Sequence, residues 1–249
     1  METLNINDKG PIRVVELNRP DALNALNGQM TNELAEIFQD AAKDDNVKVL
    51  VMTGNGRAFW AGADLKEAGE MRSRFGEMID AVIDLPKPFL IAVNGVGVGI
   101  GATIFGLADA VYMSEKARLR CPFSALGLAA EAASTVTFRQ LLGRQRASWF
   151  LLSSEWMTAQ ECVEAGLALE VVPTNELQEH VLKQADKLAA LPLASLKRTK
   201  ALIIDPIREQ LKEAVKAENL ALAELRGGPA NLEAVTAFRE KREPNFEGL

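Results

Sequence analysis

The sequence predicts an α/β fold that is followed by a C-terminal helical region. Short apolar runs typical of buried strands alternate with amphipathic stretches along the first part of the chain. After Asn175 we find no further strand pattern, and residues such as Leu211, Val215 and Leu222 recur near helical spacing. The 249 residues, 48% of them hydrophobic, suit one large α/β domain with an appendage. We therefore expect a core over 1–190 and a helical region over 191–249 that packs on the core or on a neighbouring subunit.

The individual elements follow from hydrophobic periodicity and from turn residues. Strands are expected at 12–17, 47–53, 89–93, 109–114, 118–121 and 168–172. Helices are expected at 31–44, in a segment ending near 84, and at 100–108, 135–142, 144–153, 158–165, 175–190, 192–203, 206–226 and 229–240. Thr31 is placed to cap the first helix, and Gly227, Gly228 and Pro229 separate the last two.

Composition excludes several classes of protein. The formal net charge of −6 argues against non-specific nucleic-acid binding, and no apolar run reaches membrane-spanning length. With two cysteines and a polar beginning, the chain is expected to lack a secretory signal and to be cytoplasmic. Because His180 is the only histidine, a zinc site or a Ser-His-Asp triad is hard to build, and no metal is expected.

A glycine-rich stretch joins the expected strand at 89–93 to the helix at 100–108. Glycines stand at 95, 97, 99 and 101, where the missing Cβ would let backbone N–H groups approach a negative charge. An alternative is that the glycines only permit close packing of the helix on the strand. The run also satisfies the dinucleotide-binding pattern G-x-G-x-x-A, although its position in the middle of the chain weakens that interpretation.

A second turn of small residues, Ala61-Gly62-Ala63-Asp64, also precedes an expected helix. Two such turns can aim two N–H groups at one oxygen, as in an oxyanion hole that stabilises a developing enolate or tetrahedral anion. Spacing in the sequence does not establish that the two turns meet.

Glu131 is the acidic residue whose surroundings stand out. It lies in Leu126-Gly-Leu-Ala-Ala-Glu-Ala-Ala-Ser134, where small and apolar neighbours would desolvate a carboxylate. Desolvation raises the pKa of a carboxyl group towards the value that a general base needs. Alternatively, Glu131 is an acid near the start of a helix, favoured by the helix dipole. The sequence leaves both interpretations open.

Four segments together resemble the crotonase, or enoyl-CoA hydratase/isomerase, superfamily over about 12–246. They are Asn18–Leu26, Ala58–Leu65, Val93–Gly101 and Pro122–Gly127. The resemblance implies a spiral of ββα units and a helical tail that forms trimers or dimers of trimers. It also implies an acyl-CoA thioester as substrate, with no separate cofactor. This resemblance argues against the dinucleotide-binding interpretation.

The resemblance also assigns site residues. The two oxyanion N–H donors match Ala63 and Ile100. Residues implied to contact the coenzyme A or acyl part of the substrate are Arg19, Ala22, Leu23, Ala25, Ala61, Gly62, Asp64, Leu65, Gly99 and Phe123. Phe238 and Lys241 match tail positions that close over the coenzyme A of a neighbouring subunit.

The choice of reaction depends on the position of glutamates. The two catalytic glutamates of hydratases are replaced here by Thr103 and Phe123, so ordinary hydration is not expected. The segment Pro122–Gly127 is similar to the Δ3,Δ2-enoyl-CoA isomerase branch, whose single glutamate matches Glu131. One departure is Ala130-Glu131-Ala132, where those isomerases usually have Pro-Glu-Gly. The alternatives are another reaction of the superfamily, such as hydration, thioester hydrolysis or decarboxylation, or a non-catalytic acyl-CoA-binding protein.

Overall fold

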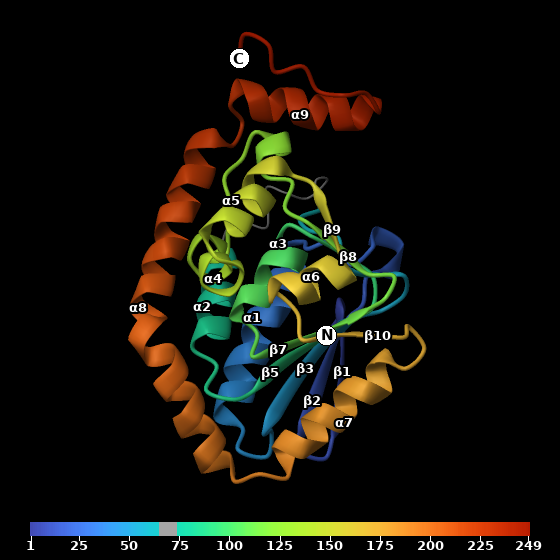
Figure 1. Ribbon diagram of the computed structural model, residues 1–249, viewed down its shortest axis with the longest axis vertical. Coiled ribbons are helices and arrows are strands. Elements are labelled where there is room, and N and C mark those ends of the chain that lie inside the picture. The colour runs from blue at the N-terminus through green and yellow to red at the C-terminus, as the bar shows by residue number, and fades with distance from the viewer. Residues whose placement is uncertain (65–73) are drawn as a thin grey trace.

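The computed structural model describes residues 1–64 and 74–249 (Figure 1). Its larger sheet has the strand order β1-β2-β3-β5-β7-β10. These strands are β1 (Leu4–Lys9), β2 (Ile12–Leu17), β3 (Val49–Gly54), β5 (Phe89–Val93), β7 (Ala110–Ser114) and β10 (Glu170–Val172). The pair β1–β2 is antiparallel, and the other neighbouring pairs are parallel. Every residue of β3 and β5 is buried, which explains why their sequences are continuous apolar runs rather than alternating ones.

Four short strands form a second, smaller sheet. Its order is β4 (Ala58–Trp60), β6 (Val96–Val98), β8 (Arg118–Arg120) and β9 (Trp156–Thr158). The pairs β3–β4, β5–β6 and β7–β8 each give one strand to each sheet, and a helix follows each pair. This repetition confirms the predicted spiral of ββα units.

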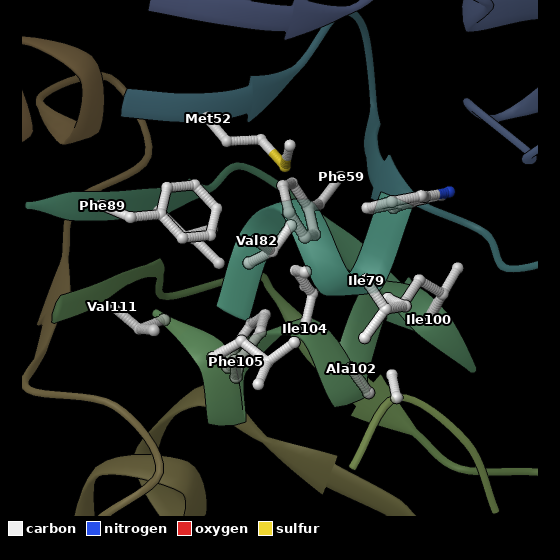
Figure 2. Close-up of a cluster of buried hydrophobic side chains, with 14 of the residues drawn as sticks. Met52, Phe59, Ile79, Val82, Phe89, Ile100, Ala102, Ile104, Phe105 and Val111 are labelled. Atoms are coloured by element: carbon white, nitrogen blue, oxygen red, sulfur yellow. The ribbon is translucent and has the colours of Figure 1, made fainter. Parts of the chain in front are cut away.

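Helices cover the larger sheet on both faces. The described helices that precede α8 (Leu193–Leu225) are α1 (Gly28–Lys43), α2 (Phe75–Ile83), α3 (Ile100–Thr103), α4 (Ser134–Leu142), α5 (Arg144–Ser153), α6 (Ala159–Ala165) and α7 (Leu177–Ala189). On one face α7 packs against a separate apolar cluster that includes Val49, Leu90 and Val181. The main core lies on the other face, where Phe59, Phe89 and Phe105 surround side chains of α2 and α3 (Figure 2).

Several predicted boundaries were wrong for identifiable physical reasons. The strands β1, β4, β6 and β9 were not predicted. β1 is mostly polar and exposed, β4 and β9 have three residues each, and β6 lies inside the glycine run. The helix predicted over 100–108 ends at Thr103 and continues as a 3-10 helix over Ile104–Leu107. The cap of α1 is Asn27, whose side chain accepts a hydrogen bond from the Met30 N–H, and Thr31 lies inside the helix.

The two helices predicted over 192–203 and 206–226 are one helix, α8 (Leu193–Leu225). Pro206 lies inside α8, where it removes one helical N–H donor without ending the helix. The next helix, α9 (Pro229–Glu240), crosses the end of α8 (Figure 1). Both helices carry exposed apolar side chains, namely Leu202, Ile203, Leu220, Leu225, Leu232 and Phe238. Among the helices described, none is long and apolar enough to cross a membrane.

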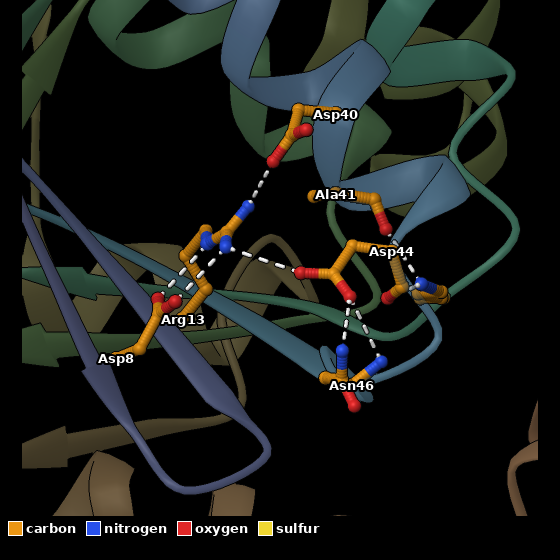
Figure 3. Close-up of polar contacts among 7 residues, drawn as sticks. Asp8, Arg13, Asp40, Ala41, Asp44 and Asn46 are labelled. Carbon is orange, nitrogen blue, oxygen red and sulfur yellow. Dashed lines mark hydrogen bonds and ion pairs between the residues drawn. The ribbon is translucent and has the colours of Figure 1, made fainter.

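A network of charges ties the β1–β2 hairpin to the end of α1, and we call it the Arg13 cluster. The guanidinium group of Arg13 pairs with Asp8 at 2.9 Å, Asp40 at 2.5 Å and Asp44 at 3.4 Å (Figure 3). Hydrogen bonding to Arg13 is the main reason why the pKa of the Asp8 carboxyl lies below its ordinary value. This cluster lies between the hairpin and the end of α1 and joins elements that are far apart in the sequence.

Candidate active site

The two turns of small residues meet in the folded chain. Parallel pairing of β4 with β6 aligns Trp60 with Gly97 and so carries the segments that follow these strands side by side. A Cβ atom on Gly99 would lie 3.8 Å from the Cα of Gly62, and one on Gly62 would lie only 3.0 Å from the Val98 carbonyl oxygen. Both glycines also have positive φ, 85° for Gly62 and 55° for Gly99. Glycine is therefore needed here both for the close approach and for the backbone conformation.

The hydrogen bonds of Leu26 fix the direction of the Ala63 N–H group. Leu26 donates to the Gly62 carbonyl at 2.7 Å and accepts from the Asp64 N–H at 2.8 Å, which forms a parallel bridge opposite Ala63. In this pattern Leu26 uses both of its own backbone groups, while those of Ala63 point to the other side of the segment. That side carries β6 and the start of α3, because β4 pairs with β6 there.

The Ile100 N–H group belongs to the first residue of α3. The first N–H groups of a helix have no partner within the helix. The Ile100 side chain is 1% exposed and packs into the main core, which holds its backbone in place (Figure 2). Within residues 1–64 and 74–249, the N–H groups of Ala63 and Ile100 have no hydrogen-bond acceptor. Two unused donors thus lie beside the contact between Gly62 and Gly99.

The carboxylate of Glu131 approaches the same place from a separate loop. A Cβ atom on Gly99 would lie 3.5 Å from Oε1 of Glu131. Burial by its surroundings, followed by the negative charge of Glu218, raises the pKa of the Glu131 carboxyl to about 7, against a smaller opposing effect of Arg226. A helix N-terminus alone would lower this pKa. The structure therefore gives Glu131 the environment of a group that exchanges protons near neutral pH.

The loop over 19–26 supports the Ala63 turn through its backbone and through Asn24. The Asn24 amide is fully buried and donates to the carbonyl groups of Asn55, Ala58 and Phe59, which lie at the start of the turn segment. Its Oδ1 atom accepts a hydrogen bond from the Arg19 N–H at 2.9 Å. Asn24 is a structural residue that the sequence analysis did not single out.

Most residues predicted to bind substrate lie together. The Arg19 guanidinium pairs with the Asp64 carboxylate at 3.0 Å and donates to the Ala25 carbonyl, so these side chains lock the two segments together. Ala61 donates to the Leu23 carbonyl at 3.1 Å, and Ala22 lies in the short 3-10 helix Pro20–Ala22.

Other residues predicted to bind substrate are not shown to lie with this group. Phe123 is 5% exposed and belongs to the main core, so its side chain is largely packed among other apolar groups. Leu65 lies outside the described residues. Phe238 is 66% exposed on α9, and Lys241 is the exposed residue that ends this helix. Within the described residues, neither Phe238 nor Lys241 contacts Glu131.

Glu218, on α8, is a second residue that the sequence analysis missed. It is buried, and its carboxylate contacts the loop that carries Glu131. A signal was present in the sequence: Val215, Glu218 and Leu222 share one helix face, so that the carboxylate falls in an otherwise apolar stripe. Among the described residues there is no cluster of histidine, cysteine or acidic side chains able to hold a metal ion.

Fold and site together define an α/β protein with paired backbone donors and, beside them, the Glu131 carboxyl group with a pKa raised to about 7. Residues 7–249 match the family described as "Enoyl-CoA hydratase/isomerase". The chain belongs to this family, the crotonase superfamily of acyl-CoA enzymes. A crystal structure of an enoyl-CoA hydratase/isomerase from Pseudoalteromonas atlantica T6c has a TM-score of 0.95 at 32% identity, covering 98% of this chain and 99% of that one.

The similar proteins of this family include both isomerases and hydratases. The chain is 35% identical to human "Enoyl-CoA delta isomerase 2" over 229 residues, which are 87% of this chain and 58% of that protein. The chain therefore spans little more than half the length of that relative. It is 32% identical to "2,3-dehydroadipyl-CoA hydratase" of Escherichia coli (strain K12) over 254 residues, which cover 100% of each chain. These identities establish the family without separating isomerase from hydratase.

Proposed function

We propose that this chain is a Δ3,Δ2-enoyl-CoA isomerase that uses Glu131 as its single base. The observation that carries this proposal is one carboxylate beside two unused backbone donors, at the contact of Gly62 with Gly99. The positions that match the hydratase glutamates hold Thr103 and Phe123, both buried and neither able to transfer a proton at neutral pH. One carboxylate suffices for moving a proton within the substrate, whereas adding water calls for a further group to activate it.

The proposed reaction moves one proton and one double bond. The Glu131 carboxylate removes a proton from C2 of a 3-enoyl-CoA, and the electron pair moves onto the thioester oxygen. The N–H groups of Ala63 and Ile100 stabilise that oxyanion, each by roughly 3 kcal/mol. Glu131 then returns the proton to C4, so that the double bond lies between C2 and C3 and no atom is gained or lost. A pKa near 7 suits both steps, because the same group must accept a proton and then release it.

The test compares two reactions in the wild type and in Glu131→Gln. We expect the wild type to convert 3-hexenoyl-CoA to 2-hexenoyl-CoA and to hydrate crotonyl-CoA poorly. Glu131→Gln preserves the shape of the side chain and removes the base, so kcat should fall by about 10²–10⁴-fold. Near wild-type isomerisation by this variant would eliminate Glu131 as the base. Hydration at a comparable rate, thioester cleavage, or binding without turnover would replace the isomerase proposal with one of the alternatives.

We further propose that the chain acts as a homotrimer or a dimer of trimers in the cytoplasm, with the region over 191–249 making the contacts between subunits. Exposed apolar side chains on α8 and α9 support this proposal, because a monomer gains nothing by keeping them in water. Phe238 and Lys241 would then reach the coenzyme A of the neighbouring subunit. Cys121 and Cys162 are buried free thiols, which agrees with a reducing compartment. Sedimentation velocity of the purified protein tests the assembly.

A further inference from the structure

The carboxylate of Glu218 connects α8 to the loop that carries Glu131. Glu218 is 6% exposed, and three donors converge on it. Its Oε2 accepts the Ala133 N–H at 2.7 Å, and its Oε1 accepts the Thr135 N–H at 3.1 Å and the Thr135 hydroxyl at 2.6 Å. Because all three groups donate, the contacts favour the ionised form of Glu218.

The loop needs such a support, because its backbone is in an unfavourable conformation. Ala132 and Ala133 both have φ of 58°, in the left-handed region where a Cβ atom costs roughly 1–2 kcal/mol per residue. They directly follow Glu131 and precede α4, which begins at Ser134. The Ala133 and Thr135 N–H groups lie where a helix start leaves donors unsatisfied. Glu218 satisfies these donors from outside the loop, so it stabilises the conformation that presents Glu131.

Glu218 also acts on Glu131 through its charge. Besides burial, the charge of Glu218 is the main influence that raises the pKa of the Glu131 carboxyl, while Arg226 at the end of α8 opposes it. Cys121, which follows β8, also faces Glu131, and burial raises the pKa of its thiol so far that it stays uncharged. Burial raises the pKa of the Glu218 carboxyl above its ordinary value, and its three donors oppose that rise without cancelling it. Because three donors point at the Glu218 carboxylate, we assign the charge at neutral pH to Glu218 and the exchangeable proton to Glu131.

We propose that Glu218 is a positioning residue of the active site, which fixes the left-handed turn after Glu131 and sets a negative charge against its carboxylate. The proposal rests on the proposed function insofar as Glu131 is the base. Two variants separate the two roles. Glu218→Gln preserves the length of the side chain and removes its charge, whereas Glu218→Asp retains the charge and shortens the reach by one methylene group.

The titration of Glu131 can be measured without any assay of activity. In protein labelled with carbon-13 at the glutamate carboxyl groups, the signal that disappears in Glu131→Gln reports Glu131. We expect its midpoint near pH 7 in the wild type and about one unit lower in Glu218→Gln, which is the size of effect expected from a nearby like charge. Glu213→Gln, an exposed change on the same helix, is the matched control and should leave the midpoint unchanged.

Kinetics then test the positioning role. The acid limb of the pH profile of kcat/KM should move down by about one unit in Glu218→Gln. In Glu218→Asp, kcat should fall about tenfold with little change in KM, and the Glu131 midpoint should stay above that of Glu218→Gln. An unchanged midpoint and profile in Glu218→Gln, or wild-type kcat in Glu218→Asp, would overturn the proposal. If the midpoint moves but the wild type does not isomerise 3-hexenoyl-CoA, the coupling holds and the proposed reaction is the part that fails.

Discussion

The loop at Glu131 and the Arg13 cluster both hold acidic side chains in place, and their surroundings have opposite effects. In the Arg13 cluster a guanidinium group pairs with three aspartates and lowers the pKa of Asp8 (Figure 3). At the loop, burial and a second carboxylate raise the pKa of Glu131. The first arrangement stabilises the fold at neutral pH, and the second costs stability there. The difference indicates that the Glu131 carboxyl group is not retained for stability, which agrees with its proposed role as the base.

Two glycines allow the sharpest test of this contrast, because both have a positive φ and only one of them lies at the site. Gly99 has φ of 55° and lies beside Glu131, whereas Gly10 has φ of 58° at the β1–β2 turn with nothing within 4 Å of an added Cβ. We expect Gly99→Ala to lower kcat/KM about 100-fold, because the new methyl group and the strained turn displace both the Ile100 N–H and Glu131. Both substitutions should also destabilise the fold, by at least about 1–2 kcal/mol, and Gly99→Ala by more, because its ψ of −119° lies outside the left-handed helical region.

Gly10→Ala is the control for a Cβ atom at a positive φ far from the site, and it should lose stability in urea denaturation while kcat/KM stays unchanged. Equal effects of the two substitutions on kcat/KM would show that backbone strain alone, wherever it lies, impairs activity. In that case the contact between Gly99 and Glu131 would have no special role.

The pH dependence of stability should also have opposite signs in the two regions. The folded pKa of Glu131, about 7, lies above the ordinary value of 4.5, so its contribution to stability is complete below pH 4.5 and is lost as the pH rises to about 7. Glu131→Gln removes this loss. The variant should gain about 2 kcal/mol relative to wild type between pH 5 and pH 8, measured by urea denaturation. The exposed change Glu213→Gln should show no such trend, and a flat difference for Glu131→Gln would mean that its pKa is not raised.

The same contrast shows what could be predicted from the sequence. The buried strands β3 and β5 were predicted because continuous apolar runs are a local signal. The resemblance supplied the spiral and the match of Glu131, and the local composition around Glu131 offered a raised pKa as one of two open interpretations. The meeting of the two turns was left open, because it depends on the pairing of β4 with β6. These short strands carry too little periodicity to be recognised.

Contacts between residues that are distant in the chain could not be predicted from the sequence. Glu218 lies 85 residues from Ala133, and the sequence around Glu218 does not indicate which N–H groups donate to its carboxylate. Arg19 and Asp64 were each predicted to contact substrate, and the structure adds that they pair with each other across 45 residues. The continuation of α8 through Pro206 was likewise missed, because the local rule for proline predicts an end where packing along α2 and α4 maintains the helix.

The smallest expected effect is that of removing the cation from the Arg13 cluster. Arg13→Met preserves most of the buried stem and leaves Asp8, Asp40 and Asp44 facing one another. We expect a loss of about 1–2 kcal/mol at pH 7, a modest value because Asp8 and Asp40 are largely exposed to solvent and salt. The value of kcat/KM should not change, since no residue of this cluster belongs to the site.

The pH dependence of this loss has the opposite sign to that of Glu131→Gln. The folded pKa of Asp8 lies below its ordinary value of 3.8, so the stabilisation is complete above pH 3.8 and is lost as the pH falls through the lower, folded value. The difference between wild type and Arg13→Met in urea denaturation should therefore shrink in acid. Lys9→Met, which removes an exposed cation from the same hairpin, is the control. If Lys9→Met is as costly as Arg13→Met, net charge rather than this geometry stabilises the hairpin, and the contrast with Glu131 loses its basis.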